Sequence, residues 1–412
     1  MPSAPCVERG FSPLDEELGL LPGHLTPSLQ RHTTQLGSWI PFAKVGPILQ
    51  DLLGVAVSEA TLRRCTERQG WVYEAAQTAA VTRIEKELPD PPQGPHKQLL
   101  SVDGAMVPLV GGEWAEVKTL VLGEIGEPVM EDGELVVHST ALSYFSRLTD
   151  AETFQRLALV ETQRRGVETA QQVIAPVDGA VWNQSFLDYH RPDAKRILDF
   201  GHAAEYVAVI GGAVGDPGSA AFHTWVSTSL HTLKHDGATA LMPELQAQVA
   251  AHPGQTELAE ALAYLEKRTA MMDYPEYQRQ GWPIGSGSVE SGNKLVVEAR
   301  LKGAGMHWAR SHVNPMLSLR NAICSDRWDE AWQDVATYQQ QQRRQRFLSR
   351  VQRNTVAPLP PPLSTAPPLS QPPVAAEVPA PAPKEPWRPA ANHPWRRWSG
   401  PTPSHRPPDA EK

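Results

Sequence analysis

The stretch Gln98-Leu99-Leu100-Ser101-Val102-Asp103-Gly104 sets the architecture, because a short apolar strand runs directly into an acid. The pattern recurs at residues 173–177, which lead into Asp178-Gly179, and at residues 196–200, which hold Asp199 near their end. Aspartate before glycine is a common turn signal, so each Asp-Gly unit alone reads as an ordinary turn. Their place after buried-looking strands instead predicts carboxylates gathered at one edge of a sheet.

The segments around these strands predict the rest of a sheet. Residues 105–110 and 114–125 read as the next two strands, with Gly111-Gly112 as the tight turn between them. A helix is expected over residues 150–170, and another begins at about residue 202. Three meandering strands, a helix, and then alternating strands and helices is the element order of a ribonuclease-H-like α/β core. We expect this core over residues 96–347, with a helical insertion at about 215–282.

A third acid lies beyond the insertion, in Gly285-Ser286-Gly287-Ser288-Val289-Glu290-Ser291. This segment is the Gly/Ser-rich entry to a helix expected over residues 287–303, and further helix is expected over 313–347. A glutamate near a helix start often only complements the helix dipole. Two aspartates and one glutamate, however, are the ligands that two divalent cations need for phosphoryl transfer. The acids Asp103, Asp178 and Glu290 are therefore candidate metal ligands.

The N-terminal part reads as helical. Residues 1–37 are weakly patterned, and residues 38–95 form a separate region. A helix is expected from residue 42 to 53, and Gly54 ends it. Ser58 is a good N-cap for a second helix to about residue 69, and residues 71–89 read as a further helix. The second helix carries Arg63, Arg64 and Arg68, as the major-groove helix of a helix-turn-helix does. An ordinary αα-hairpin explains the pattern equally well.

Composition and charge bound the class of protein. The 412 residues suffice for two or three domains, and three cysteines in no metal-binding spacing fit a reducing cytosol. Neither a signal peptide nor a membrane span is expected. Net charge is −8, yet residues 291–353 hold 11 Lys/Arg against 5 Asp/Glu. Such a segment suits phosphate contacts, although a solvated helix face is the plainer reading. The proline-rich residues 355–412 read as a disordered tail.

A series of motifs in order gives the chain a family resemblance. They occur at residues 13–20 (PLDEELGL), 101–107 (SVDGAMV), 114–118 (WAEVK), 178–182 (DGAVW), 197–205 (ILDFGHAAE), 285–294 (GSGSVESGNK) and 300–308 (RLKGAGMHW). With these motifs, the chain resembles bacterial insertion-sequence DDE transposases of the ISKra type, which are related to the Mutator-like transposases. The resemblance covers about residues 13–330.

The resemblance assigns roles to individual residues. It implies that Asp103, Asp178 and Glu290 are the catalytic triad, holding two Mg²⁺ ions or Mn²⁺ in their place. It assigns Asp199 and His202 to an accessory signature, although Asp199 also ends a strand and is the alternative second metal ligand. For His202, orienting the strand end and contacting substrate are both open. A set of basic residues is assigned to DNA phosphates: Lys294, Arg300 and Lys302. Trp182 and Trp308 are expected in the core.

The implied activity is metal-dependent DNA cleavage and strand transfer of an insertion sequence. The implied partners are double-stranded DNA (the terminal inverted repeats and the target) and further copies of the chain, which form a homo-oligomer on DNA. The expected location is the bacterial cytoplasm, at the nucleoid. Relatives begin with a longer region bearing paired cysteines, so residues 1–37 are expected to be a truncated segment without that zinc site. The alternatives are a decayed transposase that only binds DNA, and a nuclease that cleaves without joining.

Overall fold

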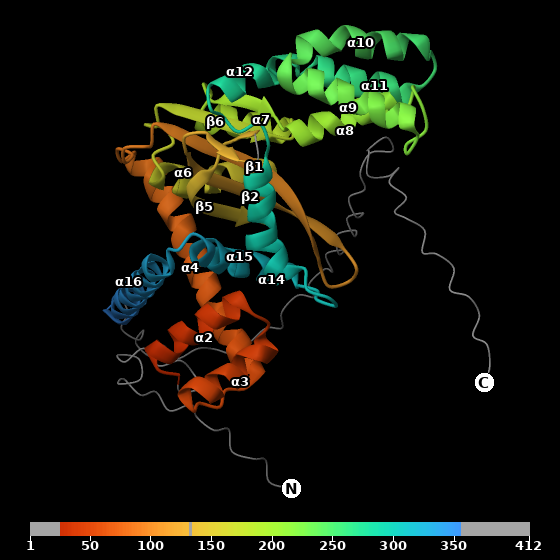
Figure 1. Ribbon diagram of the computed structural model, residues 1–412. Coiled ribbons are helices and arrows are strands. Elements are labelled where there is room, and N and C mark those ends of the chain that lie inside the picture. The colour runs from red at the N-terminus through yellow and green to blue at the C-terminus, as the bar shows by residue number, and fades with distance from the viewer. Residues whose placement is uncertain (1–24, 132–133, 356–412) are drawn as a thin grey trace, which may run out of the picture. The chain divides into compact units, whose positions relative to one another are not determined.

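The computed structural model describes residues 25–131 and 134–355 (Figure 1). The expected disordered tail lies outside these residues, apart from Thr355, and so does most of the expected truncated segment. Within them the protein is a mixed α/β fold built around one five-stranded sheet. No helix in the described ranges combines the length and the apolar character that crossing a membrane requires.

Among the described residues, three helices precede the sheet: α2 (Pro27–Trp39), α3 (Phe42–Leu53) and α4 (Glu59–Glu87). The side chain of Ser58 accepts a hydrogen bond from the backbone of Thr61, so the expected N-cap is confirmed. Apolar residues of α3 and α4 pack together, among them Val45, Leu49 and Leu62. Helix α2 falls partly within residues 1–37, for which no helix was expected.

Helix α4 is one continuous helix of 29 residues, so the expected end near residue 69 is wrong. Gly70 lies inside it, where α4 meets helix α15 (Arg310–Cys324). A Cβ atom at Gly70 would lie 2.5 Å from the carbonyl oxygen of Pro315. Glycine is therefore needed here for the close approach of two helices, and it does not end the first of them.

The sheet has the order β5-β2-β1-β6-β7. Strand β2 is antiparallel to β1 and to β5, whereas β6 is parallel to β1 and to β7. The bounds are β1 Lys97–Pro108, β2 Trp114–Ile125, β5 Ser139–Arg147, β6 Gln172–Val177 and β7 Lys195–Leu198. A separate two-stranded ribbon joins β3 (Val129–Glu131) to β4 (Glu134–Val136).

Strand β1 corrects two expectations. It continues through Asp103 and Gly104, which pair with Thr119 and Lys118 of β2, so residues 98–102 and 105–110 are not separate strands. The third antiparallel strand is instead β5, which the sequence pattern did not reveal. Because alternate residues of a strand face opposite sides, Asp103 shares a face of β1 with Leu99 and Val107.

Helices cover both faces of the sheet. One face buries Leu100 and Val102 against α4, α5 (Ala151–Leu157), α6 (Leu159–Arg164) and α7 (Val181–His190). The expected helix over 150–170 is thus two short helices that end at Arg164. On the other face, Leu99 packs with α8 (Phe200–Gly211), and Val107 packs with the segment around Val296 and with α15. Asp103 lies between these two apolar clusters, and they position it.

The expected insertion is helical, as predicted. Between the second and third acids lie α9 (Ala220–His235), α10 (Ala238–Ala251), α11 (Thr256–Glu266) and α12 (Tyr274–Arg279). Helices α9, α10 and α11 form a group of their own beside α8 (Figure 1). They bury apolar side chains against α8, among them Leu233, Leu241 and Leu265.

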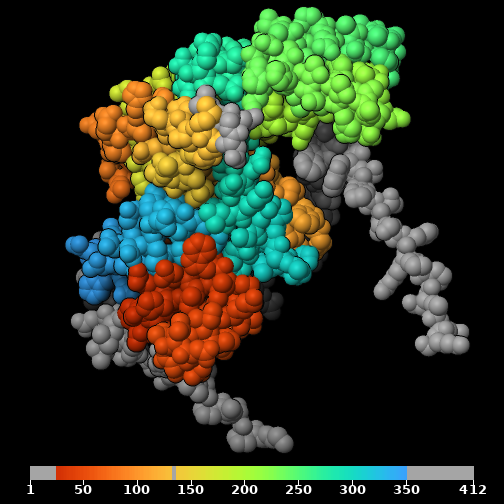
Figure 2. All heavy atoms as spheres, viewed as in Figure 1, coloured from red at the N-terminus to blue at the C-terminus, as the bar shows by residue number. Residues whose placement is uncertain are grey.

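The chain then enters α13 (Gly287–Gly292), a π-helical segment η2 (Asn293–Glu298) and α14 (Ala299–Leu301). The helix expected over 287–303 therefore exists, with a π-helical middle. Helix α15 packs against α4, α2 and β5, and α16 (Trp328–Thr355) follows it. Figure 2 shows the atoms of α16, in blue, beside those of the first helices, in red.

Candidate functional site

Acids from four elements line one cavity of about 320 Å³. Asp103 comes from the middle of β1, Asp178 directly follows β6, and Glu290 lies in α13. Asp199 and His202, from the start of α8, line the same cavity. The structure thus brings together all five residues that the sequence placed at the catalytic site, although residues 103 and 290 are far apart in the chain.

The carboxyl group of Asp103 is the most strongly perturbed member of the site. The pKa of Asp103 is raised from 3.8 to about 6, chiefly by burial and to a smaller extent by the negative charges of Asp178 and Glu290. Hydrogen bonds from the Gly104 backbone and from Asn293 act in the opposite direction. The negative charges of Asp178 and Glu290 therefore repel that of Asp103, as like charges around a shared cavity do.

Asp178 is held by its own loop and by the helical insertion. Its Oδ1 atom accepts hydrogen bonds from the backbone N–H of Ala180, at 2.9 Å, and from the Nδ2 atom of Asn183. The hydroxyl of Tyr264 donates to the carbonyl oxygen of Asp178, and Arg268 Nη2 donates to the carbonyl of Gly179 at 2.8 Å. The backbone that carries Asp178 is therefore fixed from both sides.

Gly179 makes this clamp possible. Its φ angle is +78°, a conformation that residues with a side chain rarely adopt. A Cβ atom at this position would lie 2.5 Å from Arg268 Nε and 2.8 Å from the Tyr264 hydroxyl. The glycine that first reads as a plain turn signal is thus required by contacts with α11 and the residues that follow it.

Asp199 uses both carboxylate oxygens within the protein. Its Oδ1 atom accepts from the backbone N–H of His202 at 2.6 Å, which caps α8. Its Oδ2 atom accepts from the backbone N–H of Ser286 at 2.5 Å. The side chain is 7% exposed. Together with a backbone bond from Phe200 N–H to the Ile284 carbonyl, Asp199 ties the end of β7 to the loop that precedes Glu290.

His202 borders the cavity from the first turn of α8. Its Nδ1 atom lies 3.3 Å from Glu205 Oε2, one turn along the helix. Its ring packs edge-on against Tyr206 and Tyr264, and these two tyrosine rings stack on each other at 3.8 Å between centroids. The His202 ring is therefore oriented by Tyr264, which also donates to the Asp178 carbonyl, and by Tyr206, which stacks on Tyr264.

Two asparagines support the acids, and sequence reasoning missed both. Asn293 Nδ2 donates to Asp103 Oδ2 at 2.9 Å, and Asn183 Nδ2 donates to Asp178. Each amide is buried, and its carbonyl oxygen has no hydrogen-bond partner among the described residues. The one available signal was spacing, since Asn293 lies three residues after Glu290, at the start of the π-helical segment. Such π-helical segments often occur at functional sites.

The predicted DNA contacts differ in their surroundings. Arg63, Arg64 and Arg68 are exposed on α4, and Lys294 is exposed beyond Glu290. Lys302 is partly exposed, and its Nζ atom lies 2.6 Å from Glu298 Oε1. These five side chains reach the surface, so their positions are compatible with phosphate contacts.

Arg300 lies in the interior and is 2% exposed. Its Nε atom donates to the Gly37 carbonyl at 3.1 Å, and its guanidinium packs over the rings of Phe42 and Trp308. It thereby joins the N-terminal helices to the segment after Glu290, and this burial is at odds with a phosphate contact. Trp308 is buried and Trp182 packs against the core, as expected for both.

The donor chemistry of the cavity suits a hard divalent cation, because its acids offer carboxylate oxygens and no thiolate. In the described ranges, however, no three His, Cys, Asp or Glu side chains are gathered closely enough to hold a metal ion. Three carboxylates that repel one another are expected to stand apart in this way. The residues fit Mg²⁺ by type, while their side chains do not enclose a preformed ion site.

Comparison with known proteins gives no family for the chain. No protein-family model matches it, and no curated protein matches it.

Proposed function

We propose that the protein is a DNA transposase that cleaves and joins DNA strands at the cavity of Asp103, Asp178 and Glu290. The observation that carries the proposal is the convergence of these three acids, from a strand, a strand end and a helix, on one cavity. The raised pKa of Asp103 supports it, since perturbed carboxyls in a cleft are typical of catalytic sites.

The sheet supports the same proposal. Three antiparallel strands followed by two parallel strands, in the order β5-β2-β1-β6-β7, are the arrangement we expect of a ribonuclease-H-like core. In such open sheets, ligands bind beyond the carboxyl ends of parallel strands. Asp178 and Asp199 follow the parallel strands β6 and β7, and Asp103 lies on the adjoining β1.

Asp103, Asp178 and Glu290 would hold two Mg²⁺ ions, with Mn²⁺ as a substitute. When bound, such ions activate an oxygen nucleophile and stabilise the leaving oxygen of a phosphodiester. We assign the role of second metal ligand to Asp178, because both carboxylate oxygens of Asp199 already accept hydrogen bonds from backbone N–H groups. The chain itself then positions the acids: Asn293 and Asn183 orient two of them, and Tyr264 with Arg268 fixes the backbone of Asp178.

The reaction has two steps on DNA. Water attack on a phosphodiester frees a 3′-OH at the element end, and that hydroxyl then attacks a phosphodiester of the target. Each step breaks one P–O bond and forms another, and no protein side chain is bonded to DNA. Exposed basic residues of α4, together with Lys294 and Lys302, would contact phosphates of the terminal repeats and the target. Arg300 is left out of this set because it is buried.

Metal-dependent cleavage of DNA that contains the element ends tests the proposal. Glu290→Gln removes one carboxylate and keeps the size of the side chain, so cleavage should fall about 100- to 1000-fold. Glu260→Gln, an exposed glutamate of α11, is the matched control and should cleave as the wild type does. Equal cleavage by wild type and Glu290→Gln would refute the assignment.

Two rival functions have their own outcomes. Salt-dependent DNA binding with no metal-dependent nicking would identify a decayed transposase that keeps only its binding surfaces. Nicking without products of strand transfer would identify a nuclease of the same architecture. The cavity of three acids favours both enzymes over the binding protein, because a protein that only binds DNA gains nothing from negative charges that repel phosphates.

A further inference from the structure

The hairpin of β1 and β2 projects past the edge of the sheet that carries the acids (Figure 1). Strand β6 ends at Val177, and its register with β1, when continued, places this end beside Val102. Beyond Asp103, no described strand pairs with the free side of β1, and β5 pairs with β2 only from Lys118 onward. Residues 104–117 therefore form a two-stranded arm, here called the hairpin arm.

The tip of the hairpin arm exposes two large apolar side chains. Val110 is 66% exposed and Trp114 is 55% exposed. They flank the turn of Gly111 and Gly112, where a Cβ atom at either glycine would meet no atom within 4 Å. Two large apolar side chains gathered at one projecting point mark a candidate contact surface.

Backbone hydrogen bonds hold the tip against the loop that follows α14. Val110 N–H donates to the Trp308 carbonyl at 3.0 Å, and Trp308 N–H donates to the Pro108 carbonyl at 3.1 Å. At Gly305 of this loop a Cβ atom would meet no atom within 4 Å, so another chain can approach the backbone closely there. Because the tip is fixed before it meets a partner, less loop freedom is lost on binding.

The charges beside the tip suit a partner that carries phosphates. Residues 302–310 contain a lysine, a histidine and an arginine, and no acid. The two acids of the hairpin arm are each matched by a cation. Arg310 Nη2 lies 2.5 Å from Glu113 Oε1, and Lys118 Nζ lies 2.7 Å from Glu116 Oε2. A phosphate near the tip thus meets basic side chains, and both carboxylates of the arm are neutralised.

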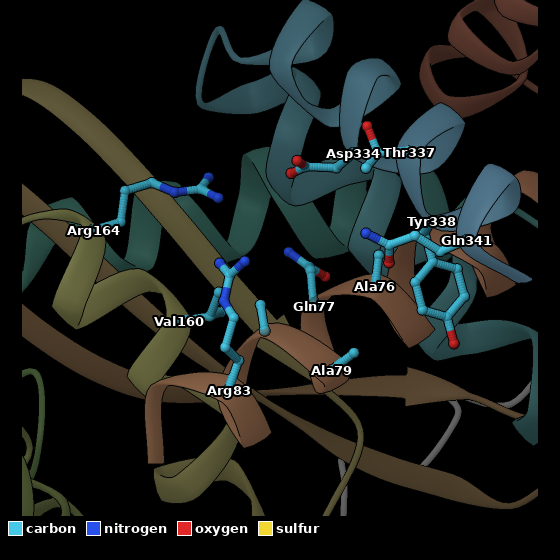
Figure 3. A pocket seen from close by; sticks show the side chains of 11 residues that line it. Ala76, Gln77, Ala79, Arg83, Val160, Arg164, Asp334, Thr337, Tyr338 and Gln341 are labelled. Atoms are coloured by element: carbon cyan, nitrogen blue, oxygen red, sulfur yellow. The ribbon is translucent and has the colours of Figure 1, made fainter. Parts of the chain in front are cut away.

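A hollow of about 310 Å³ between α4, α6 and α16 is a basic surface of a different kind (Figure 3). Arg83 and Arg164 line it, and they face Asp334 across the opening. The carboxylate of Asp334 lies inside the hollow, where it would repel a phosphate that enters. No large apolar side chain projects there as Trp114 does, because small alanines of α4 line much of the hollow. The hairpin arm is therefore the better candidate for a contact with nucleic acid.

We propose that the Trp114 ring stacks on an unpaired base of the DNA that the cavity of acids holds, with Val110 beside it. An aromatic ring can stack on any base, and apolar side chains can enter between base steps of a duplex. The contact is therefore tolerant of sequence. The inference rests on the proposed function for the identity of the nucleic acid, and it adds a contact with bases to the phosphate contacts already proposed.

The strand register sets where on the DNA this contact falls. Trp114 pairs with Pro108, five residues beyond Asp103, which is about 17 Å along an extended strand. Neighbouring base pairs are about 3.4 Å apart, so the stacked base lies about five base pairs from the phosphodiester at the cavity. Alternation along the strands also places the Trp114 ring on the face opposite Asp103. The base that it meets is thus not one at the cleaved bond.

Binding of DNA with one unpaired base tests the proposal. The dissociation constant of the full chain is measured by fluorescence anisotropy for two labelled duplexes of the same arbitrary sequence. One duplex is fully paired, and the other has a single unpaired adenine in one strand. The wild type should bind the second duplex more tightly, because its free base stacks without the cost of breaking a pair. Stacking contributes a factor of about 5–150 in affinity, and Trp114→Ala should remove most of this preference. Trp114→Phe, which keeps an aromatic ring, should retain part of it.

Tyr189→Ala is the matched control, because Tyr189 is also an exposed aromatic residue but lines a hollow beside the end of α4. Its preference should equal that of the wild type, and thermal unfolding checks that all variants are folded. The proposal is overturned if Trp114→Ala keeps the full preference, or if the wild type has none. It is equally overturned if Trp114→Ala changes only the oligomeric state in size-exclusion chromatography, since the tip would then contact another copy of the chain.

The test separates the hairpin arm from the proposed chemistry. Glu290→Gln lacks an acid of the cavity but keeps the arm, so its preference for the unpaired base should equal that of the wild type. A chain that never cleaves DNA can therefore still confirm the stacking contact. Conversely, if the chain cleaves DNA and Trp114→Ala keeps the full preference, the stacking contact alone is overturned.

Discussion

Replacing Asp103 with asparagine should stabilise the folded protein at about pH 8, although it removes an acid of the proposed site. Burial, and then the charges of Asp178 and Glu290, raise the pKa of Asp103 from 3.8 to about 6. A carboxyl whose pKa rises on folding favours the folded state while it is protonated in that state. This stability is complete below pH 3.8 and is lost as the pH rises through about 6. Above that range the ionised carboxylate disfavours folding, and a neutral amide does not.

The size of the effect follows from the same pKa. A rise of one pKa unit corresponds to about 1.4 kcal/mol, so the rise to about 6 sets an upper limit of about 3 kcal/mol. Part of this gain is lost, because Gly104 and Asn293 both donate to the carboxylate and an amide has one acceptor oxygen. A net gain of about 1–2 kcal/mol in the free energy of unfolding remains. It corresponds to a rise in Tm of about 2–6 °C.

Thermal unfolding followed by circular dichroism at about pH 8 and at about pH 5 measures this effect. The gain should be largest at the higher pH and smaller by about 1.4 kcal/mol at the lower, which lies about one unit below the folded pKa and within the range over which the stability from protonation is lost. Asp216→Asn, at an exposed aspartate, is the control and should leave Tm unchanged at both values. Millimolar Mg²⁺ should raise the Tm of the wild type more than that of Asp103→Asn. A variant that is no more stable than the wild type at the higher pH would refute the reasoning.

Two further substitutions test features that the sequence did not reveal. Asn293→Ala removes the amide that donates to Asp103, and hydrogen bonds to charged groups are worth about 1.5–3 kcal/mol, so DNA cleavage should fall about 10- to 100-fold. DNA affinity should stay the same, and an equal loss of both would contradict a positioning role. Gly70→Ala places a methyl group against the Pro315 backbone and should lower the free energy of unfolding by about 1–3 kcal/mol in a denaturant titration. Gly287→Ala meets no atom within 4 Å and is the control; equal stability of the two variants would contradict the account of the helix crossing.

The acids and the parallel strands were predictable because their signals are local. A buried run followed by an acid marks β6 and Asp178, and the Gly/Ser-rich entry marks the helix of Glu290. The pairing of Asp103 in the middle of β1 was not predictable in the same way, because Asp-Gly is a turn signal that the neighbouring strand β2 overrides.

Strand β5 was missed because its own residues show no strand pattern and because its stabilising partners come from another part of the chain. Its residues include small polar side chains that are buried, such as Ser143 and Ser146, so no clear apolar alternation marks it. As an edge strand it needs partners for its free backbone groups, and side chains supply them from a distance. Ser146 N–H donates to Asn321 Oδ1 at 3.1 Å, and Tyr144 N–H donates to Ser325 Oγ at 3.0 Å. These partners come from α15 and the residue that ends it.

Arg300 shows the same limit for the site. A basic residue in a basic segment reads as a surface contact, and nothing local shows that two aromatic rings will cover it. Only the packing of α2 and α3 against the segment after Glu290 places Phe42 and the Gly37 carbonyl around its guanidinium. Asn183 could not be predicted for a similar reason. Its amide donates to the carboxylate of Asp178, five residues earlier, and the sequence does not specify the shape of the loop that brings the two together.

The bond of Asp199 to Ser286 has a consequence for how the chain can change over evolution. Between Asp199 and Ser286 the chain passes through helices α8 to α12, and the two ends of this segment are joined by hydrogen bonds. The excursion is therefore a closed loop, and the entropy of closing a loop grows by only about 0.6 kcal/mol for each doubling of its length. Residues can be gained or lost at the far turns, between α9 and α10 or between α10 and α11, while the register of Glu290 against Asp178 stays the same. The buried carboxylate of Asp199 thus marks a boundary. The turns between the helices that follow it can change in length, whereas the spacing of Asp178 and Glu290 is fixed.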